Sequence, residues 1–479
     1  MDFSKLQYRQ YIDGAFVEGD SRLETIICPG NLEKVGEVKL AGAAQATAAL
    51  EAAKRAFPIW SSMRLEERGE WIFKLRDAIE EERENLHTLL VRESGKLNGH
   101  NTFEIDSLIN YLTYFLEQAK CDQDTILRDI SGGKGCYPVV REPVGVVVAC
   151  LAWNFPMHNL ATKLGPILAS GCTCVIKPAT KTPLSTLYFG TILDRIGFPK
   201  GVINLIAGDA KEISDTLISS KIPAMLTMIG STQGGLKMVR DSATSVKRFS
   251  MELGGNAPVI VTPTADLKAA AAHTVGNKMR CAGQTCTAPQ RAFVHRDVLS
   301  KFTELCVAEA KTAVCGMGDE DANVGALISE DAVKRMEQIV ADAVEKGASV
   351  LAGGERPKDK KGHYFLPTIL TNVTREMLAY KEEIFGPILC IMPYDDLDEA
   401  IALANDTEYG LASYVWATNY YEINRIVKGL EYGVVNVNGP GTGANYPHAG
   451  WKNSGIGADG SSYSLEEYTR RKGIRISLA

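Results

Sequence analysis

The pattern of apolar and polar positions changes in character along the chain. Tyr11–Val17 carries an Asp-Gly pair between two short apolar runs, which is a strong signal for a β-hairpin. Residues 43–121 then show long helical patterns, with apolar residues three and four positions apart among many charges. After residue 143, near-continuous apolar runs alternate with helical segments. The predicted strands are Val144–Cys150, Cys172–Ile176, Val202–Ile206 and Ala224–Ile229, separated by helices at Thr182–Ile196, Ala210–Ser219 and Gly234–Ser242.

Buried strands that alternate with helices predict a doubly wound parallel sheet. The same pattern begins again after Gly255, with a long helix from Asp266. The strands predicted there are Pro258–Val261, Arg291–His295, Pro387–Pro393 and Val434–Val437. We therefore predict an α/β chain with two such domains, joined near Met251–Gly255. Residues 1–121 and 142–251 form the first domain, and residues 252–460 form the second.

Two segments lie outside this alternation. Residues 122–141 are mixed in character and contain Gly132-Gly133-Lys134-Gly135, which is typical of an excursion from the main core. In residues 461–479, the tail Lys472–Leu478 alternates like an edge strand. This strand would pair with the excursion or with a neighbouring subunit.

Composition narrows the class of protein. The chain has 479 residues, 45% of them hydrophobic and 23% charged, which is a globular profile too long for a single core. Its net charge of -6 comes without a clustered basic stretch, so a nucleic-acid partner is not expected. No signal peptide or apolar run of membrane-spanning length is evident, and we expect a cytoplasmic protein without a membrane partner. The eleven cysteines are scattered without paired CxxC motifs, so we expect reduced thiols and no metal centre.

Two motifs have the character of a dinucleotide site. Gly230-Ser231-Thr232-Gln233-Gly234-Gly235 lies between a predicted strand and a helix, where small residues let backbone N–H groups approach a phosphate. A tight strand-to-helix turn is the alternative interpretation. Lys177 ends another predicted strand, at the edge of the sheet where ligands bind in this class, although a surface lysine is equally common.

Three further segments could carry chemistry. Cys286 follows Gly283-Gln284-Thr285, and a thiol in a small, polar segment can serve as a nucleophile, although Cys281 could be a decoy. Glu252 lies among apolar residues ahead of paired glycines, which suits either a general base or a buried ion pair. Asn154, in Trp153-Asn154-Phe155-Pro156, could donate to an oxyanion or form an ordinary strand-ending turn.

Taken in order and spacing, these motifs and Glu382-Glu383-Ile384-Phe385-Gly386-Pro387 resemble the aldehyde dehydrogenase superfamily over essentially the whole chain. The resemblance implies that fold, with the excursion and tail forming a small β-segment for oligomerisation into a homodimer or homotetramer. It also implies NAD(P)-dependent oxidation of an aldehyde, with Cys286 as nucleophile. Asn154 and the Cys286 N–H would hold the oxyanion, and Glu252 would activate water.

The resemblance further implies which residues meet the cofactor. Lys177 would reach the adenine ribose, and Ser231 with its helix would meet the pyrophosphate. Glu383 would hold the nicotinamide ribose, with Phe385 packed near the ring. The remaining residues expected at the cofactor are Trp153, Thr180, Lys181, Gly230 and Gly235, and Lys163 is expected near the cofactor and the proton path.

Cofactor choice rests on one departure from the family. Members that prefer NAD commonly carry a glutamate at the position of Thr180, where a carboxylate would repel a 2′-phosphate. Thr180, followed by Lys181, would not repel a 2′-phosphate. We therefore expect NADP to be accepted and predict that it is the preferred cofactor.

Substrate residues are suggested by two subfamilies. Arg280 stands where succinate semialdehyde dehydrogenases place an arginine, although Thr162 replaces a second one. The segment around His448 resembles lactaldehyde and glycolaldehyde dehydrogenases, and His448 would touch a substrate hydroxyl or anion, or have no role. Asn159 and Thr287 are expected in the pocket wall. A small polar or anionic aldehyde is the expected substrate; a coenzyme A-acylating enzyme and a catalytically silent structural relative remain the alternatives.

Overall fold

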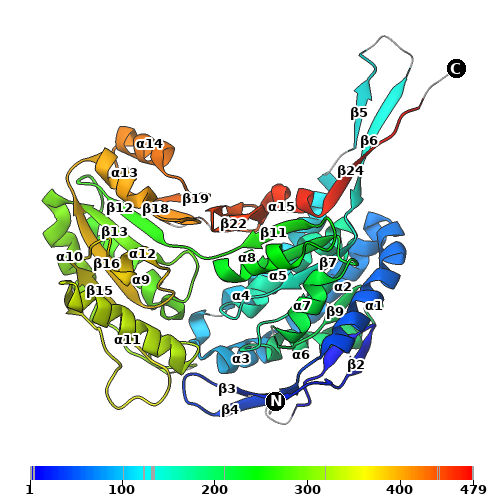
Figure 1. Ribbon diagram of the computed structural model, residues 1–479, viewed down its shortest axis with the longest axis horizontal. Coiled ribbons are helices and arrows are strands. Elements are labelled where there is room, and N and C mark those ends of the chain that lie inside the picture. The colour runs from blue at the N-terminus through cyan, green and yellow to red at the C-terminus, as the bar shows by residue number, and fades with distance from the viewer. Residues whose placement is uncertain are drawn as a thin grey trace.

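A computed structural model describes residues 3, 6–100, 102–121, 124–130, 135–209, 211–318, 320–439, 441 and 443–476. The predicted glycine pair Gly132-Gly133, the helix start at Ala210 and the tail residues Ser477 and Leu478 lie outside the described residues. The described chain folds into two lobes with a projecting arm (Figure 1). Among the described helices, none combines the length and apolar character needed to cross a membrane.

The first lobe is built on a sheet with strand order β2-β1-β9-β8-β7-β10-β11-β22. Strands β7 to β11 are parallel, and the chain runs outward from β7 in both directions. The predicted hairpin is confirmed as β1 and β2. The strands are β1 (Gln10–Ile12), β2 (Ala15–Val17), β7 (Val146–Cys150), β8 (Thr173–Lys177), β9 (Ile203–Leu205), β10 (Met225–Ile229), β11 (Arg248–Glu252) and β22 (Gly455–Ile456).

Helices cover both faces of this sheet (Figure 1). Apolar side chains of α4 and α5 pack in the same core as the buried faces of β7 and β8. Glycine ends α5 at Gly171 with a φ of 90°, a left-handed conformation that glycine adopts without strain. The helices are α1 (Ala43–Ser62), α2 (Leu65–Glu81), α3 (Arg83–Ser94), α4 (Thr102–Cys121), α5 (Pro156–Ser170), α6 (Leu184–Ile196), α7 (Glu212–Ser219) and α8 (Thr232–Asp241).

The second lobe holds a sheet of order β14-β15-β16-β13-β12-β18-β19, with its own apolar core. All its pairings are parallel except that of the edge strand β14. Its strands are β12 (Ala257–Val261), β13 (Pro289–His295), β14 (Ser349–Ala352), β15 (Thr368–Thr371), β16 (Ile388–Tyr394), β18 (Ala412–Trp416) and β19 (Val434–Val437). Its helices are α9 (Leu267–Met279), α10 (Arg296–Ala310), α11 (Glu330–Glu345), α12 (Leu378–Lys381), α13 (Leu397–Asn405) and α14 (Tyr420–Gly429).

The arm consists of β5 (Thr125–Arg128), β6 (Cys136–Pro143) and β24 (Thr469–Gly473). Strand β24 pairs antiparallel with β6, which confirms that the tail can pair with the excursion of the same chain. The arm projects from the first lobe beside α15 (Ser461–Glu467) (Figure 1). The short ladders are β3 (Leu23–Ile27) with β4 (Lys34–Lys39), β17 (Tyr409–Gly410) with β21 (Trp451–Lys452), and β20 (His448–Ala449) with β23 (Ala458–Asp459).

One segment returns from the second lobe to the first. Gly455–Ile456, within the range expected for the second domain, forms β22 and pairs with Met251 and Glu252 at the end of β11. The chain therefore crosses between the lobes more than once. The end of β11 is held by neighbours on both of its sides.

Candidate active site

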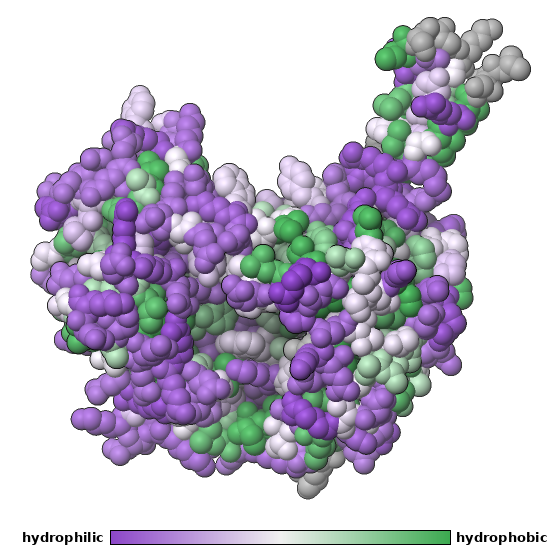
Figure 2. Space-filling view, in the orientation of Figure 1, coloured by the Kyte–Doolittle hydropathy of each residue, from purple (hydrophilic) through white to green (hydrophobic). Residues whose placement is uncertain are grey.

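The carboxyl ends of the first lobe's parallel strands are level with one another. Cys150 of β7 pairs with Lys177 of β8 and with Met228 of β10, and Ile229 pairs with Glu252 of β11. The strand order reverses between β7 and β10, which is the switch point where ligands bind in doubly wound sheets. Lys177 and Glu252 are thereby placed along one edge, facing the junction of the two lobes, and Figure 2 shows the molecule hollowed between these lobes.

Cys286 lies in a short loop between the 3₁₀ turn Arg280–Gly283 and β13. Within the turn, Cys281 and Ala282 have φ values of 49° and 50°, a left-handed conformation that is strained for residues with a side chain. Gln284 braces the loop, because its Nε2 donates to the Cys281 and Ala326 carbonyls at 3.0 and 3.2 Å. Its Oε1 accepts from the backbone N–H of Ile328 at 2.9 Å. Sequence reasoning missed this role, although Gln284 lies inside the motif that identified Cys286.

Three side chains converge at this loop. The Cys286 sulfur, a Glu252 carboxylate oxygen and a His448 ring nitrogen all lie within 4.8 Å of one another. Glu252 is only 5% exposed, and its Oε1 is 3.2 Å from His448 Nε2. Burial and the neighbouring carboxylate of Glu252 raise the pKa of the Cys286 thiol well above its usual value. His448, predicted to touch substrate, thus has Glu252 as its partner, and that contact raises the imidazole pKa against the opposing effect of burial.

Asn154 brings an amide to the same loop. It follows β7, is 5% exposed, and its Nδ2 donates to the Gln284 carbonyl at 3.1 Å. Asn159, on the first turns of α5, donates to Asn154 Oδ1 at 3.3 Å and to the Ala152 carbonyl at 3.1 Å. The amide of Asn154 is therefore held in one orientation. Its partner on the loop, Gln284, is two residues before Cys286 in the sequence.

Lys163 is fully buried and forms an ion pair with Asp459. Asp459 lies on β23, where it is paired directly with His448 on β20. A buried ion pair is costly to desolvate, so the two charges stabilise the fold only as a pair. Sequence reasoning missed Asp459, which lies 296 positions from its partner Lys163.

The residues expected at the phosphates have the geometry of a strand-to-helix turn. Ser231 is the N-cap of α8, and its side chain accepts from the N–H of Gly234 at 3.1 Å. A Cβ at Gly235 would lie 2.6 Å from a methyl carbon of Leu253, so a larger residue there would require Leu253 to move. Similarly, a Cβ at Gly230 would lie 2.4 Å from the end of Met228. The arrangement leaves N–H groups at the start of α8 that fit an anionic phosphate.

Three further sets of side chains were expected to contact the cofactor. Trp153 and Phe385 meet edge to face with centroids 5.5 Å apart, and Phe385 has a φ of 50°. Glu383 accepts from the Gly255 N–H at 2.8 Å, and burial raises its pKa to about 7. Lys177 is buried, which lowers its pKa. Aromatic rings, a carboxylate and a lysine are side chains that suit the rings, ribose hydroxyls and phosphates of NAD(P).

Thr180 and Lys181 differ in their surroundings. The Thr180 hydroxyl is 3.4 Å from the Gly208 carbonyl, near the edge of the sheet. Lys181 instead extends to the second lobe, where its Nζ donates to Ser329 at 3.2 Å, and it lies 5.9 Å from the Trp153 ring. Asp209, a carboxylate that sequence reasoning missed, interacts electrostatically with Lys177.

Arg280, at the start of the 3₁₀ turn, lies against two aromatic rings. Its guanidinium lies 4.5 Å from the ring centroid of Phe103 and 5.9 Å from that of Phe155. Within the described part of the chain it has no ion pair and no side-chain hydrogen bond, so its donors are free. Burial and nearby cations, His448 and Arg280 among them, lower the pKa of His158 to about 4. Thr287 lies just past Cys286, and its carbonyl accepts from Tyr414 at 2.9 Å.

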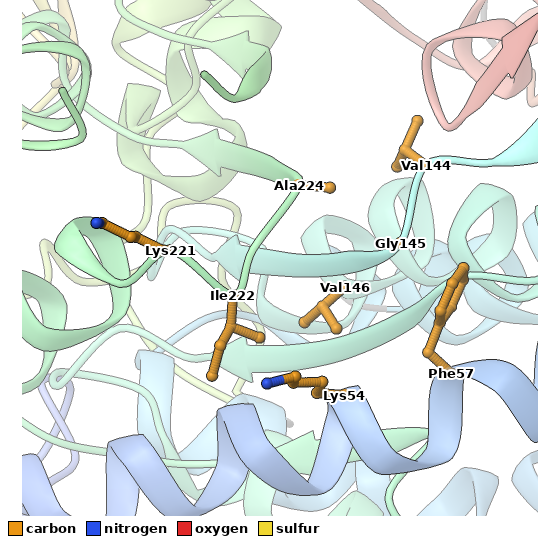
Figure 3. A pocket seen from close by; sticks show the side chains of 8 residues that line it. All are labelled: Lys54, Phe57, Val144, Gly145, Val146, Lys221, Ile222 and Ala224. Carbon is orange, nitrogen blue, oxygen red and sulfur yellow. The ribbon is translucent and has the colours of Figure 1, made fainter. Parts of the chain in front are cut away.

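A separate pocket lies at the opposite edge of the first sheet (Figure 3). It has a volume of about 330 Å³ and lies where β7 and β10 begin, above α1. Its lining residues are Lys54, Phe57, Val144, Gly145, Val146, Lys221, Ile222 and Ala224. None of the candidate site residues lines it.

The fold and the site together define an α/β protein with two mainly parallel sheets and a thiol, a carboxylate and an amide gathered where they meet. A family model described as "Aldehyde dehydrogenase family" matches residues 16–474. The chain belongs to the aldehyde dehydrogenase family, and it is an oxidoreductase of that family.

Relatives across this family are similar over nearly their full length. A glutarate-semialdehyde dehydrogenase of Pseudomonas aeruginosa is 37% identical over 98% of both chains. An NADP(+) succinate-semialdehyde dehydrogenase of Escherichia coli is 36% identical over 94% of this chain and 93% of its own length. A solved lactaldehyde dehydrogenase is 33% identical, with a TM-score of 0.95 over 98% of this chain and 99% of that one.

Proposed function

We propose that this enzyme oxidises a small, polar or anionic aldehyde to its carboxylic acid through a thioester on Cys286, with NAD(P) as the oxidant. The observation that carries the proposal is the convergence of the Cys286 sulfur and the Glu252 carboxylate within 4.8 Å, beside the loop that Asn154 contacts. A nucleophile, a base and an oxyanion donor are the groups that acyl chemistry requires.

The first step is the attack of Cys286 on the aldehyde. Thiolate is the active form of cysteine, so the thiol first loses its proton to the solvent. The sulfur then bonds to the aldehyde carbon, and the carbonyl oxygen becomes an oxyanion. The free amide hydrogen of Asn154 and the Cys286 N–H would donate to it in this thiohemiacetal.

Oxidation and hydrolysis complete the reaction. NAD(P), when bound, supplies the ring that accepts the hydride from this carbon. Glu383, Trp153 and Phe385 would hold that ring and its ribose, and Ser231 with α8 would hold the phosphates. Cys286 is left as a thioester; Glu252 takes a proton from water, the hydroxide adds to the thioester carbon, and the C–S bond breaks to release the acid.

The free guanidinium of Arg280 favours an anionic substrate, because a planar fork of donors suits a carboxylate. The names of the semialdehyde relatives agree with this class. Lys163, buried with Asp459 near His448, would take part in carrying protons away. Thr180, with no carboxylate of its own, supports NADP as the preferred cofactor, a preference that the NADP(+) relative shares by name.

A cofactor-reduction assay across succinate semialdehyde, lactaldehyde, glycolaldehyde and propanal, with both cofactors, tests the proposal. We expect reduction that is strongest with a small polar or anionic aldehyde, favours NADP in kcat/KM, and disappears in Cys286→Ala. Free acid as the product supports water as the acceptor. An acyl-coenzyme A product would instead indicate an acylating enzyme. No cofactor reduction with any of the aldehydes would indicate a structural relative.

A further inference from the structure

The three side chains that converge at the loop are all of types that bind metal ions in proteins. Among the described residues, Glu252, Cys286 and His448 are the one set of three potential metal ligands whose donor atoms lie within 4.8 Å of one another. A sulfur, an imidazole nitrogen and a carboxylate oxygen are the donors that zinc and its close relatives take in proteins. Such a centre could not be predicted from the sequence, because the three residues come from distant segments.

We propose that Cys286, Glu252 and His448 bind one thiophilic divalent cation of the zinc class, and that this cation reversibly blocks the nucleophile. The inhibitory half of this inference rests on the proposed function. The binding half rests on the geometry of the three side chains alone.

The distances are close to those that a tetrahedral ion needs. Zinc bonds of about 2.0–2.3 Å place tetrahedral ligand atoms roughly 3.3–3.8 Å apart. The Glu252 and His448 atoms are already 3.2 Å apart, and the sulfur is within 4.8 Å of both. Small side-chain rotations therefore complete a three-ligand face, and the fourth position is left for water, as in open zinc sites.

The backbone positions of the ligands are fixed by different strands. Glu252 ends β11 between β10 and β22, and His448 is held on β20 through its pairing with Asp459 on β23. Such a framework lowers the ordering cost of binding. The His448 side chain is 31% exposed and that of Glu252 only 7%, so an ion would enter from the His448 side.

Metal and aldehyde exclude one another at this site. Coordination replaces the thiol proton with the cation, and the sulfur electron pair that would bond to the aldehyde carbon is held in the metal bond. The carboxylate that would activate water is occupied as well. No electrons are transferred, so removal of the cation by a chelator restores the original thiol.

Cadmium binding to the full-length enzyme tests the inference directly, because a cadmium–thiolate bond has an ultraviolet charge-transfer band. We expect one Cd²⁺ per chain, displaced by Zn²⁺, with the band absent in Cys286→Ser. His448→Asn should weaken binding by at least about 100-fold, more than the loss of an outer-shell partner. The exposed Cys121 provides the matched control, since Cys121→Ser should bind Cd²⁺ as the wild type does.

Alkylation of Cys286, followed by peptide mass spectrometry, separates lost binding from lost folding. Cd²⁺ should protect Cys286 from iodoacetamide in the wild type and not in His448→Asn, while both proteins react equally without metal. A charge-transfer band that survives in Cys286→Ser, or equal affinity in His448→Asn, would overturn the inference. Cd²⁺ binding by a protein that oxidises no aldehyde would refute the proposed function and leave this site standing; oxidation without Cd²⁺ binding would do the reverse.

Discussion

Asn154 is hydrogen-bonded through both the nitrogen and the oxygen of its side-chain amide. One of its hydrogens is used on the Gln284 carbonyl, and its oxygen is held by Asn159. The second hydrogen remains for a ligand, and an oxyanion donor is typically worth about 3 kcal/mol.

We therefore expect Asn154→Ala to lower kcat/KM by roughly 100-fold with little change in cofactor affinity. Steady-state kinetics together with cofactor titration by fluorescence would measure both quantities. Asn159→Ala, which only orients the amide, should cost less. A loss below about threefold in Asn154→Ala would remove the oxyanion role.

Arg280 should distinguish between aldehydes. Its guanidinium packs against Phe103 and forms no ion pair or hydrogen bond with the described side chains. A substrate carboxylate would therefore supply its ion-pair partner. Arg280→Ala should raise KM for succinate semialdehyde by roughly 10- to 100-fold, the value of a charged hydrogen bond. KM for propanal, measured with the same protein, should hardly change. Equal effects on the two aldehydes would show that Arg280 does not anchor the anion.

At this scale, the candidate residues that can be chosen from the sequence are those that lie in compact motifs. Cys286, Glu252 and Asn154 were recognisable because each lies in a short segment of unusual composition. The partners were not, because contacts such as His448–Glu252 join positions 196 apart. Only the fold shows that these positions meet.

At the scale of elements, the buried strands were the most predictable part. Strands β7, β8, β10 and β12 are continuous apolar runs and were predicted to within two residues. β11 was missed, because Arg248, Ser250 and Glu252 interrupt its apolar character. The two-residue strands near the C-terminus have no periodicity to detect, although they position His448 and Asp459.

Glu467, at the end of α15, carries a pH effect on stability. Its Oε1 accepts from the Ala458 N–H at 2.8 Å. Burial raises its pKa from 4.5 to about 7, against the opposing effect of its hydrogen bonds with Ser250 and the Ala458 N–H. The folded state therefore holds a proton that the unfolded state has lost between these values, and stability falls as pH rises through that window.

Glu467→Gln should remove this part of the slope. Urea unfolding at several pH values from about 5 to 8 would measure it, with the variant losing less stability than the wild type as pH rises. The neighbouring Glu466 is exposed, and Glu466→Gln serves as the control with an unchanged slope. A Glu467→Gln profile parallel to the wild type would contradict the assignment.

At the scale of the whole molecule, alternation of strands and helices was enough to predict two α/β lobes and an arm outside them. The return of Gly455–Ile456 to the first sheet could not be predicted, because so short a strand is defined only by its neighbours. We propose that residues 1–121 and 142–251 bind the dinucleotide, that residues 252–460 supply the nucleophile, and that the arm with the tail holds subunits together.

The arm carries apolar side chains that no described residue covers. Ile126 and Leu127 on β5 are 71% and 55% exposed, and green patches mark the arm in Figure 2. We expect a homodimer or homotetramer, and replacement of both residues by glutamate should lower the mass measured by light scattering. Tyr421, 82% exposed on α14, offers a control whose replacement by glutamate leaves the mass unchanged. An unaltered mass in the Ile126/Leu127 variant would show that the arm does not join subunits.

The covalent bond to Cys286 is the central claim, and trapping it is the most direct test. In Glu252→Gln the nucleophile remains while the base that activates water is lost, so the thioester should accumulate. Incubation with succinate semialdehyde and NADP, followed by peptide mass spectrometry, should show the succinyl group on the peptide that carries Cys286, with about one NADPH formed per modified chain. Turnover of aldehyde to acid with no adduct at Cys286, or with an adduct on another residue, would contradict the account.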